Sequence, residues 1–454
     1  MLKSYLLPHP PLLLEDIGNA NDVLKIKKAY TAVADEINRA EYDVVIIISP
    51  HNECYEDAFY VDNEKEYFGN MQKFHSQVKV RCDVDVPLAN LIVSLATNGA
   101  SPINATTKVF DRPLCDHGTI IPLTYVHPKK VVTISQSGLS LIDHYRFGKI
   151  VREACERLNR KAIFIASGDL SHCCKPNDGE HDYHPAGPRF NRLIRKYIKT
   201  GNTEKLLNLP KKIIGEAKEC GLKSIITLLG FNDGYKIKGK NLAFEDPYGV
   251  GYLVASFKPV KPISSQFALI TKRYFQRVVD RRKRDDMYVD LARKNVESYV
   301  LKNQPYTQVE RYPEPLLEKA ACFVSIKKNG SLRGCIGSVV PETNFIADEI
   351  IRNSFLAATH DPRFPRVELP ELDQLTYSVD ILSPLVKVDK LNELNPKKYG
   401  ILVCTRNKQG VLLPDIGIND VAQQLNIAKD KAKINRHEPV EIFKFTVDRH
   451  QSAE

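Results

Sequence analysis

Three β-branched apolar runs in the first half of the chain constrain its fold more than any other feature. They are "YDVVIIIS" (42–49), "KVVTIS" (130–135) and "KAIFIAS" (161–167), and each ends in small or polar residues. Runs that are apolar at every position are typical of central strands covered on both faces. Amphipathic stretches at 141–159 and 189–201 accompany them. This alternation predicts an α/β domain over residues 1–257, with a mixed central sheet and helices on both faces.

The C-terminal part of the chain has a different pattern. Residues 258–285 contain prolines, a serine pair and a basic run, and we interpret them as a linker or bridging helix. Helix-like and strand-like segments follow over 286–454, where "KNGS" (328–331) offers a hairpin turn. We therefore predict a second, smaller domain of the α+β class over 286–454.

Charge and aromatic content weigh against nucleic acid as a partner. The formal net charge is +10, and part of it is concentrated in "KRYFQRVVDRRKR" (272–284). Such a run is more often a solvated helix face or linker than a binding surface. The chain has no Trp, so a base-stacking surface gains no support. We rank nucleic-acid binding last among the functions considered.

The cysteines and apolar segments bear on the compartment. Ten cysteines are scattered without a CxxC pair, in neither the spacing of a zinc module nor that of a disulfide scaffold. Unpatterned thiols in a chain of this size are typical of a reduced, cytoplasmic protein. Prolines interrupt the apolar N-terminus, and no run approaches the roughly 18 apolar residues of a membrane span. We expect no membrane association.

Four histidines of the first region share one kind of position. His9 in "LLPHPPLLL" follows an apolar start, while His51 in "VVIIISPHN" and His172 in "IFIASGDLSH" follow predicted strands. His117 in "CDHGTIIPL" is expected on a loop before a further apolar segment. Ligands of open α/β sheets bind beyond the carboxyl ends of the strands. One histidine there is a weak signal, but four beside Pro, Gly, Asp or Ser are hard to assign to packing.

Histidines in this arrangement favour a metal site. Two neutral imidazoles and one carboxylate on a single face suit non-haem Fe(II), with positions left for substrate and oxygen. The segment "GEAKECGLKSIITLLGF" (215–231) supplies Glu216 and Glu219 just before an apolar stretch. An acidic residue there is explained equally well as a favourable charge at a helix N-terminus. The residues alone leave those two interpretations open.

The order of these motifs resembles a known family. "LPHPP", "SPHN", "DHGTIIPL", "SGDLSH" and "ECGLKSIITLLG" are similar to the motifs of class III extradiol ring-cleaving dioxygenases of the protocatechuate 4,5-dioxygenase type. They also resemble the Memo family, which shares that fold, and the resemblance covers about residues 1–256. It implies that His9, His51 and Glu219 hold Fe(II). It further implies that His117 and His172 move protons and orient a catechol-type substrate.

The third ligand has an alternative. Glu219 and Cys220 are adjacent, and the resemblance to Memo-type proteins implies a cysteine at this position. Adjacent side chains diverge by about 100° on a helix, so only one is expected to face the ion. A glutamate gives an iron site, whereas a cysteine favours softer ions such as Cu(I). We favour Glu219 with Fe(II), and keep Cys220 with copper as the alternative.

The second domain carries two further motifs, "SLRGCIG" (331–337) and "THDPRFPRV" (359–367). Arg333 offers a fork of donors that suits an anion. Cys335 fits an inert strand cysteine better than a nucleophile. These motifs resemble the AMMECR domain family over about residues 285–450. The pairing of the two domains resembles the AmmeMemoRadiSam set, which suggests a radical-SAM protein as a partner.

Two functions follow as hypotheses. The first is an Fe(II)-dependent extradiol-type dioxygenase that uses O₂ on a small aromatic substrate, fused to an AMMECR-type accessory domain. The second is a Memo-like protein that binds iron or copper and has redox or interaction functions without ring cleavage. No oligomeric state follows from the sequence, and a homo-oligomer is left open.

Overall fold

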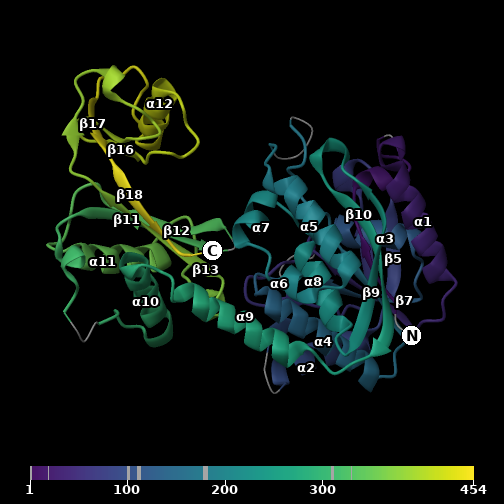
Figure 1. The fold of residues 1–454 in the computed structure, drawn as a ribbon. Coiled ribbons are helices and arrows are strands. Elements are labelled where there is room, and N and C mark those ends of the chain that lie inside the picture. The colour runs from purple at the N-terminus through teal and green to yellow at the C-terminus, as the bar shows by residue number, and fades with distance from the viewer. Residues whose placement is uncertain are drawn as a thin grey trace. The chain divides into compact units, whose positions relative to one another are not determined.

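The computed structural model describes residues 3–18, 20–99, 103–109, 114–176, 182–307, 311–328 and 330–453. The chain forms two compact units, residues 1–276 and residues 277–454 (Figure 1). The division falls inside helix α9 (Phe267–Arg282). The predicted linker, 258–285, therefore covers the end of a strand and all of α9. Its boundaries, and those of the two domains, remain predictions.

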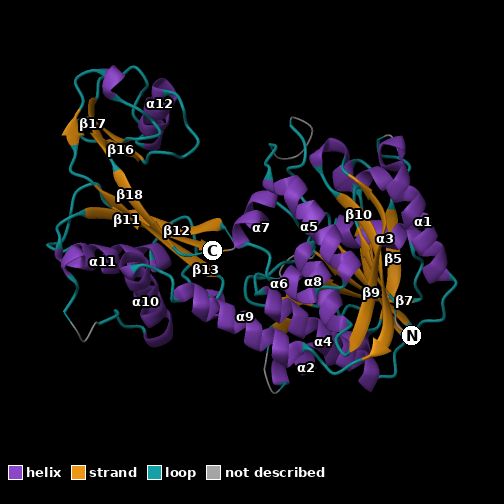
Figure 2. Cartoon of the chain, in the orientation of Figure 1, coloured by secondary structure: helices purple, strands orange, loops and turns teal. Residues whose placement is uncertain are grey.

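An eight-stranded sheet forms the centre of the first unit (Figure 2). Its five inner neighbours β5, β7, β2, β8 and β1 are parallel, and β4, β10 and β9 add antiparallel pairs at the edges. In spatial order the strands are β4 (Glu66–Asn70), β5 (Lys79–Val84), β7 (Lys130–Ser135), β2 (Val44–Ser49), β8 (Ala162–Ser167), β1 (Ser4–Leu7), β10 (Tyr252–Pro262) and β9 (Tyr235–Glu245).

Alternate residues of the inner strands enter two separate cores. In β2, Ile46 and Ile48 join the core on one face, while Val45 and Ile47 join the core on the other. Helices therefore cover both faces (Figure 2), as continuous apolar runs require. The first face is covered by α2 (Val86–Asn98), α4 (Leu141–Arg157), α5 (Ala186–Thr200) and α8 (Leu222–Phe231), and the second by α1 (Leu24–Asn38) and α3 (His117–Tyr125). Short elements complete the unit: α6 (Thr203–Leu207), α7 (Lys211–Ala217), β3 (Phe59–Tyr60) and β6 (Ala105–Thr106).

The second unit contains two antiparallel sheets. The first has the order β12 (Ser331–Gly337), β11 (Ala321–Lys328), β13 (Leu375–Leu382), β18 (Val447–Gln451), and α10 (Met287–Lys302) and α11 (Ile346–Thr359) pack on it. The second has the order β14 (Val386–Lys387), β17 (Glu441–Phe445), β15 (Gly400–Cys404), β16 (Gln409–Leu412), and α12 (Val421–Lys431) packs on it. The turn between β11 and β12 includes Gly330 at a φ of 86°, a left-handed value that suits glycine.

The fold class predicted for both domains is confirmed. Each β-branched run forms a strand of the central sheet: 42–49 contains β2, 130–135 is β7 and 161–167 contains β8. Within the described part of the chain, no helix is long and apolar enough to cross a bilayer. All ten cysteines lie among the described residues, and none of them forms a disulfide.

Candidate metal centre

The histidines that the sequence singles out lie at one edge of the central sheet. His9 and His51 each follow a strand by two residues, β1 and β2 respectively, and His172 follows β8 within five residues. These three strands are parallel neighbours, so their carboxyl ends meet at the same edge. His117 is the first residue of α3 rather than a loop residue. The N-terminus of α3 brings its ring to the same place.

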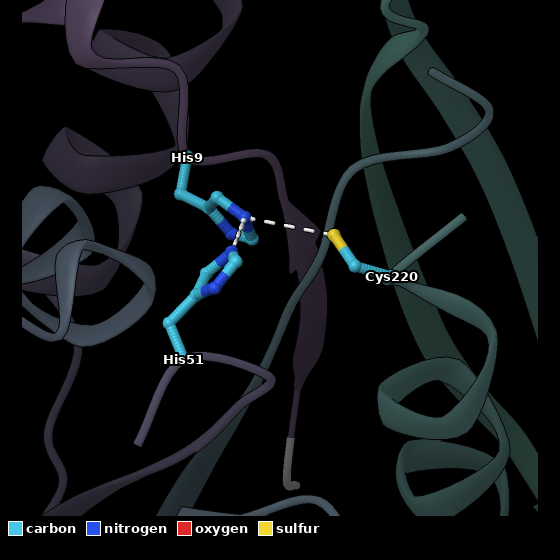
Figure 3. Close-up of side chains that lie close together, drawn as sticks. All are labelled: His9, His51 and Cys220. Atoms are coloured by element: carbon cyan, nitrogen blue, oxygen red, sulfur yellow. Dashed lines mark hydrogen bonds between the residues drawn. The ribbon is translucent and has the colours of Figure 1, made fainter. Parts of the chain in front are cut away.

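His9, His51 and Cys220 converge on one point (Figure 3). The Nε2 atoms of His9 and His51 are 3.0 Å apart, and Cys220 Sγ lies 3.7 Å from His9 Nε2. One ligand atom from each of the three residues lies within 4.8 Å of the other two. The two rings come from strands β1 and β2, and the thiol comes from the turn before α8. Residues more than 200 positions apart thus present three soft or borderline donors to one point, which suits a single metal ion.

Hydrogen bonds fix the position of His9. Its ring Nδ1 lies 2.9 Å from Ser167 Oγ, at the end of β8. Its backbone N–H donates to Asp169 Oδ1 at 2.9 Å, and the other carboxyl oxygen of Asp169 lies 3.5 Å from Nε2. A bond at Nδ1 sets the orientation of the ring and leaves Nε2 for a ligand. His9 is therefore held rigidly in a buried setting, with 1% of its surface exposed.

The chain around His51 is tied to the start of α3. Ser49 Oγ accepts the His51 N–H at 3.1 Å and donates to Asp116 Oδ1 at 2.5 Å. Asp116 also caps α3 by accepting the Thr119 N–H at 3.2 Å. The same carboxylate thus places both His51 and the helix that begins with His117. The rings of those two histidines stack with their centroids 3.9 Å apart.

His172 lies at the far side of the site. Its Nδ1 contacts the carbonyl oxygen of Lys218, which can only accept, so Nδ1 carries the proton. In the neutral ring, Nε2 is then the acceptor. A ligand atom of His172 also lies within 4.8 Å of those of Asp169 and Cys220. The histidine therefore borders the site from the β8 side.

Burial keeps the imidazoles neutral. It lowers the pKa of His51 to about 4 and that of His117 to about 3, helped by the neighbouring histidines and Lys73. Burial and the three surrounding histidines hold the pKa of His9 well below its usual value. Neutral imidazoles are the form that binds metal ions. The rings are thus in the ligand form at neutral pH.

Glu219 and Cys220 take different directions. A carboxyl oxygen of Glu219 accepts the Leu222 N–H at 2.6 Å, at the N-terminus of α8. Cys220 Sγ instead approaches His9, and it also accepts the Asp169 N–H at 3.2 Å. Burial raises the pKa of Glu219 to about 7, against the opposing effect of its hydrogen bonds and Lys223. Glu219 thus lies at the N-terminus of α8, in the setting that the sequence offered as its other interpretation.

Sequence reasoning missed Asp169. This residue is 5% exposed and contacts both His9 and Cys220. Burial raises its pKa to about 7, although the His9 N–H opposes that effect. The sequence could have predicted Asp169 near the site, since "SGDLSH" places it three residues before His172 at the end of a strand. The motif alone was a weak indication, because a lone aspartate after a glycine is usually a turn residue.

In the second unit, Arg333 has internal partners. Its guanidinium makes two bonds to Glu371, both at 2.9 Å, and donates to the carbonyl oxygens of Pro365 and Arg366. Cys335 lies on β12 opposite Ser325, whose hydroxyl is 3.1 Å from its sulfur. The Cys335 N–H donates to Asp361 at 2.8 Å. The donors that Arg333 was expected to offer to an anion are therefore engaged within the protein.

Comparisons with known proteins identify the family of each unit. Residues 3–255 match the family model described as the catalytic LigB subunit of aromatic ring-opening dioxygenase, and residues 289–450 match the AMMECR1 model. The N-terminal unit is thus a dioxygenase-like domain, and the C-terminal unit is an AMMECR1 domain. The chain belongs to the LigB family, in a form fused to AMMECR1, so the resemblance inferred from the sequence motifs is confirmed.

The same fusion occurs in a relative. Protein CA_C1420 of Clostridium acetobutylicum is 35% identical over 464 residues, which cover 99% of this chain and 99% of its own. A protein of Thermotoga maritima is 46% identical over 168 residues, which cover 36% of this chain and 97% of its own. Two solved structures are similar to parts of the chain. The uncharacterized protein PH0010 of Pyrococcus horikoshii has 26% identity and a TM-score of 0.35. The match covers 36% of this chain and 89% of PH0010. The uncharacterized protein JW3007 of Escherichia coli has 13% identity and a TM-score of 0.40. The match covers 56% of this chain and 99% of JW3007.

Proposed function

We propose that the N-terminal unit holds one redox-active metal ion through His9, His51 and Cys220, and that the protein is a metal-dependent oxidoreductase. The observation that carries this proposal is the convergence of two Nε2 atoms and one Sγ within 4.8 Å of one another. Membership of the LigB family supports metal dependence, a small-molecule substrate and O₂. A bound ion of this kind would supply single-electron transfer and a meeting point for O₂ and substrate.

Cys220 is our preferred third ligand, ahead of Glu219. The carboxylate of Glu219 is engaged by the Leu222 N–H, and moving it toward His9 would leave the start of α8 without that bond. The Cys220 sulfur already lies 3.7 Å from His9 Nε2, and a thiolate can bind a metal while it accepts the Asp169 N–H. A thiolate beside two imidazoles favours copper over Fe(II), because thiolate is a soft ligand. The Memo-like function with copper therefore has the better support, and the iron dioxygenase is the second candidate.

The outer histidines support the second candidate. His117 stacks on His51, and His172 is held at Nδ1 by the Lys218 carbonyl. A neutral imidazole accepts the proton that a phenolic hydroxyl releases on binding, and returns it later. His117 and His172 are therefore our proposed proton-transfer residues in the dioxygenase. A radical-SAM partner remains a prediction of the family resemblance.

Metal content separates the two ligand sets. The protein is purified without oxygen, and copper and iron are measured per chain in wild type, Cys220→Ser and Glu219→Gln. We expect Cys220→Ser to lose at least about tenfold in metal affinity, because a neutral hydroxyl is a poor ligand for soft ions. Glu219→Gln should keep the metal, since its amide oxygen still caps α8. Cys115→Ser is the matched control for removal of a half-buried thiol.

Two outcomes would reject the preferred assignment. The first is loss of metal in Glu219→Gln with retention in Cys220→Ser. The second is iron as the only metal, together with oxygen uptake when catechols are added. The first would make Glu219 the ligand, and the second would select the ring-cleaving dioxygenase.

A further inference from the structure

One edge of the central sheet carries lysines that the metal centre does not use. Strand β9 is the last strand of this sheet, and its neighbour among the described residues is β10 alone (Figure 1). Every second residue in the first half of β9 is a lysine, and two lysines of β10 lie across from them. We call these exposed residues the lysine face: Lys236, Lys238, Lys240, Lys258 and Lys261.

Strand geometry places the lysine face on one side of the sheet. Residues two apart in a strand point to the same side, so the lysines of β9 form a row with a spacing of roughly 7 Å. Lys258 lies directly opposite Lys238, and Lys261 directly opposite Lys236. Directly opposite residues share a side of the sheet, with their Cβ atoms about 5 Å apart. Ile237 points the other way and packs in the core that α5 covers, so the lysines lie on the side of α1.

Acidic side chains do not neutralise the lysine face. Among the described residues, none of its five ammonium groups forms a salt bridge or a hydrogen bond. The acids of α1 have other partners, since Glu36 pairs with Lys3, and Asp35 lies 3.9 Å from Arg39. Glu245, at the end of β9, accepts two backbone N–H groups of α1 at 3.0 Å. The positive charges are therefore available to a partner.

The opposed lysines are not explained by protection of the edge. Lysines on an exposed edge strand prevent it from pairing with other chains, and this explains those of β9. It does not explain Lys258 and Lys261, which lie on the inner strand β10. Like charges directly opposite each other destabilise a sheet. A negatively charged partner would remove this repulsion when it binds.

We propose that the lysine face and the outer edge of β9 bind an acidic, extended segment of a partner protein, which joins the sheet as a further strand. The outer edge offers backbone N–H and C=O groups that a peptide strand pairs with in register. Every second side chain of an added strand would lie beside the lysine row, so carboxylates at alternate positions match it. Nucleic acid would use the charges and leave the backbone edge unpaired. This binding surface is independent of the metal centre.

Short labelled peptides test the expected register by fluorescence anisotropy with the full chain. The first peptide alternates glutamate with valine, the second has the same composition with its glutamates in one block, and the third is the alternating peptide with methylated backbone nitrogens. At low ionic strength, we expect the alternating peptide to bind at least about tenfold more tightly than either of the others. The second peptide keeps the charge but loses the register, and the third keeps the charge but cannot donate to a strand.

Paired substitutions locate the binding surface. We expect Lys236→Gln with Lys238→Gln to weaken binding of the alternating peptide about tenfold, because two of its matching charges are lost. The matched control is Lys196→Gln with Lys199→Gln, which removes two exposed lysines of α5 on the other side of the sheet and should leave binding unchanged. Equal affinity for the alternating and block peptides, or no effect of the β9 pair, would overturn the proposal. Equal affinity would indicate a surface that recognises charge alone, as one for nucleic acid does.

Stability gives a second readout that needs no peptide. Lys238→Glu places a carboxylate opposite Lys258 and replaces repulsion with attraction. We expect its denaturant midpoint to lie above that of wild type, while binding of the alternating peptide is lost. A midpoint below that of wild type would show that the opposed lysines carry no cost, and the argument for a charged partner would fail.

Discussion

The histidine cluster of the first unit and the Arg333 cluster of the second unit differ in what their polar groups are bonded to. Both arise from conspicuous sequence motifs, and both are buried. At the first, the Nε2 atoms of His9 and His51 face each other at 3.0 Å with the Cys220 sulfur beside them. At the second, the fork of Arg333 is taken by Glu371 and by two backbone carbonyls.

This difference separates a ligand site from a structural device. Two neutral rings with their Nε2 atoms 3.0 Å apart can share one N–H···N hydrogen bond, which uses the lone pair of only one ring. A metal ion satisfies both at once. The Arg333–Glu371 pair is complete, so a bound anion would have to break existing bonds. A specific motif therefore identifies a constrained position, and only the partners of its polar atoms tell whether that position binds something.

The largest effect is expected from His9 and His51. Replacing either by Ala removes one of three converging donors, and we expect metal affinity to fall at least about a hundredfold. Metal is measured per chain after anaerobic purification. His127→Ala, at an exposed histidine, is the control. Stoichiometric metal in His51→Ala would show that this ring is not a ligand, and the comparison between the two clusters would then fail.

Removing Arg333 should break the second cluster without touching the first. Arg333→Ala leaves the Glu371 carboxylate buried without its main partner, since Glu371 is 8% exposed and keeps Lys328 at 3.2 Å and the Glu368 N–H at 3.0 Å. We expect a loss of about 3–5 kcal/mol in the free energy of unfolding of the second unit. Chemical denaturation measures this loss.

Two further measurements sharpen the same test. The paired variant Arg333→Met with Glu371→Leu removes both charges and should be less destabilised than Arg333→Ala. Metal content should equal that of wild type in both. If Arg333→Ala lowers the free energy of unfolding by less than about 1 kcal/mol, the guanidinium does not stabilise the second unit. Anion binding would then be the better explanation of Arg333.

Much of the fold was predictable because its signals are local. The runs that became β2, β7 and β8 are apolar at every position, and only a strand covered on both faces requires that. The position of His9 and His51 followed from the rule that parallel strands present their carboxyl ends at one edge. The convergence of residues 42 positions apart needed no further information than the strand order.

The choice between Glu219 and Cys220 was not predictable, because it depends on a local conformation. Lys218 has a left-handed φ of 50°, which ends α7, and a bridge pairs Glu219 with Ser171 before α8 begins. That path directs the carboxylate to the Leu222 N–H and the thiol to His9. Both residues lie between α7, which ends at Ala217, and α8, which begins at Leu222, so the turn and not helix geometry separates their side chains. The partners of Arg333 were hidden likewise, because Glu371 is 38 residues away.

The smallest effect is expected from His144, which lies in the first unit and tests the comparison there. This histidine is fully buried in α4, yet both of its nitrogens are bonded: Nδ1 to the Ser140 carbonyl at 2.9 Å, and Nε2 to the Ser137 N–H at 3.4 Å. Burial, aided by the charge of Lys223, lowers its pKa to about 3. It resembles Arg333 in having its partners within the protein, although it is a histidine of the ligand-binding unit.

The sign of its pH dependence follows from that pKa. The unfolded chain takes up a proton at His144 below pH about 6.5, whereas the folded protein resists protonation until pH about 3. The contribution of His144 to stability is therefore fully present above pH 6.5 and is lost on acidification. We expect the free energy of unfolding of wild type to fall between pH 6.5 and pH 3 by on the order of 2–4 kcal/mol more than that of His144→Gln. Denaturant titrations at several pH values measure this difference. Metal should not alter it, because His144 is no ligand; a difference that vanishes when metal is added would place His144 with the ligand cluster.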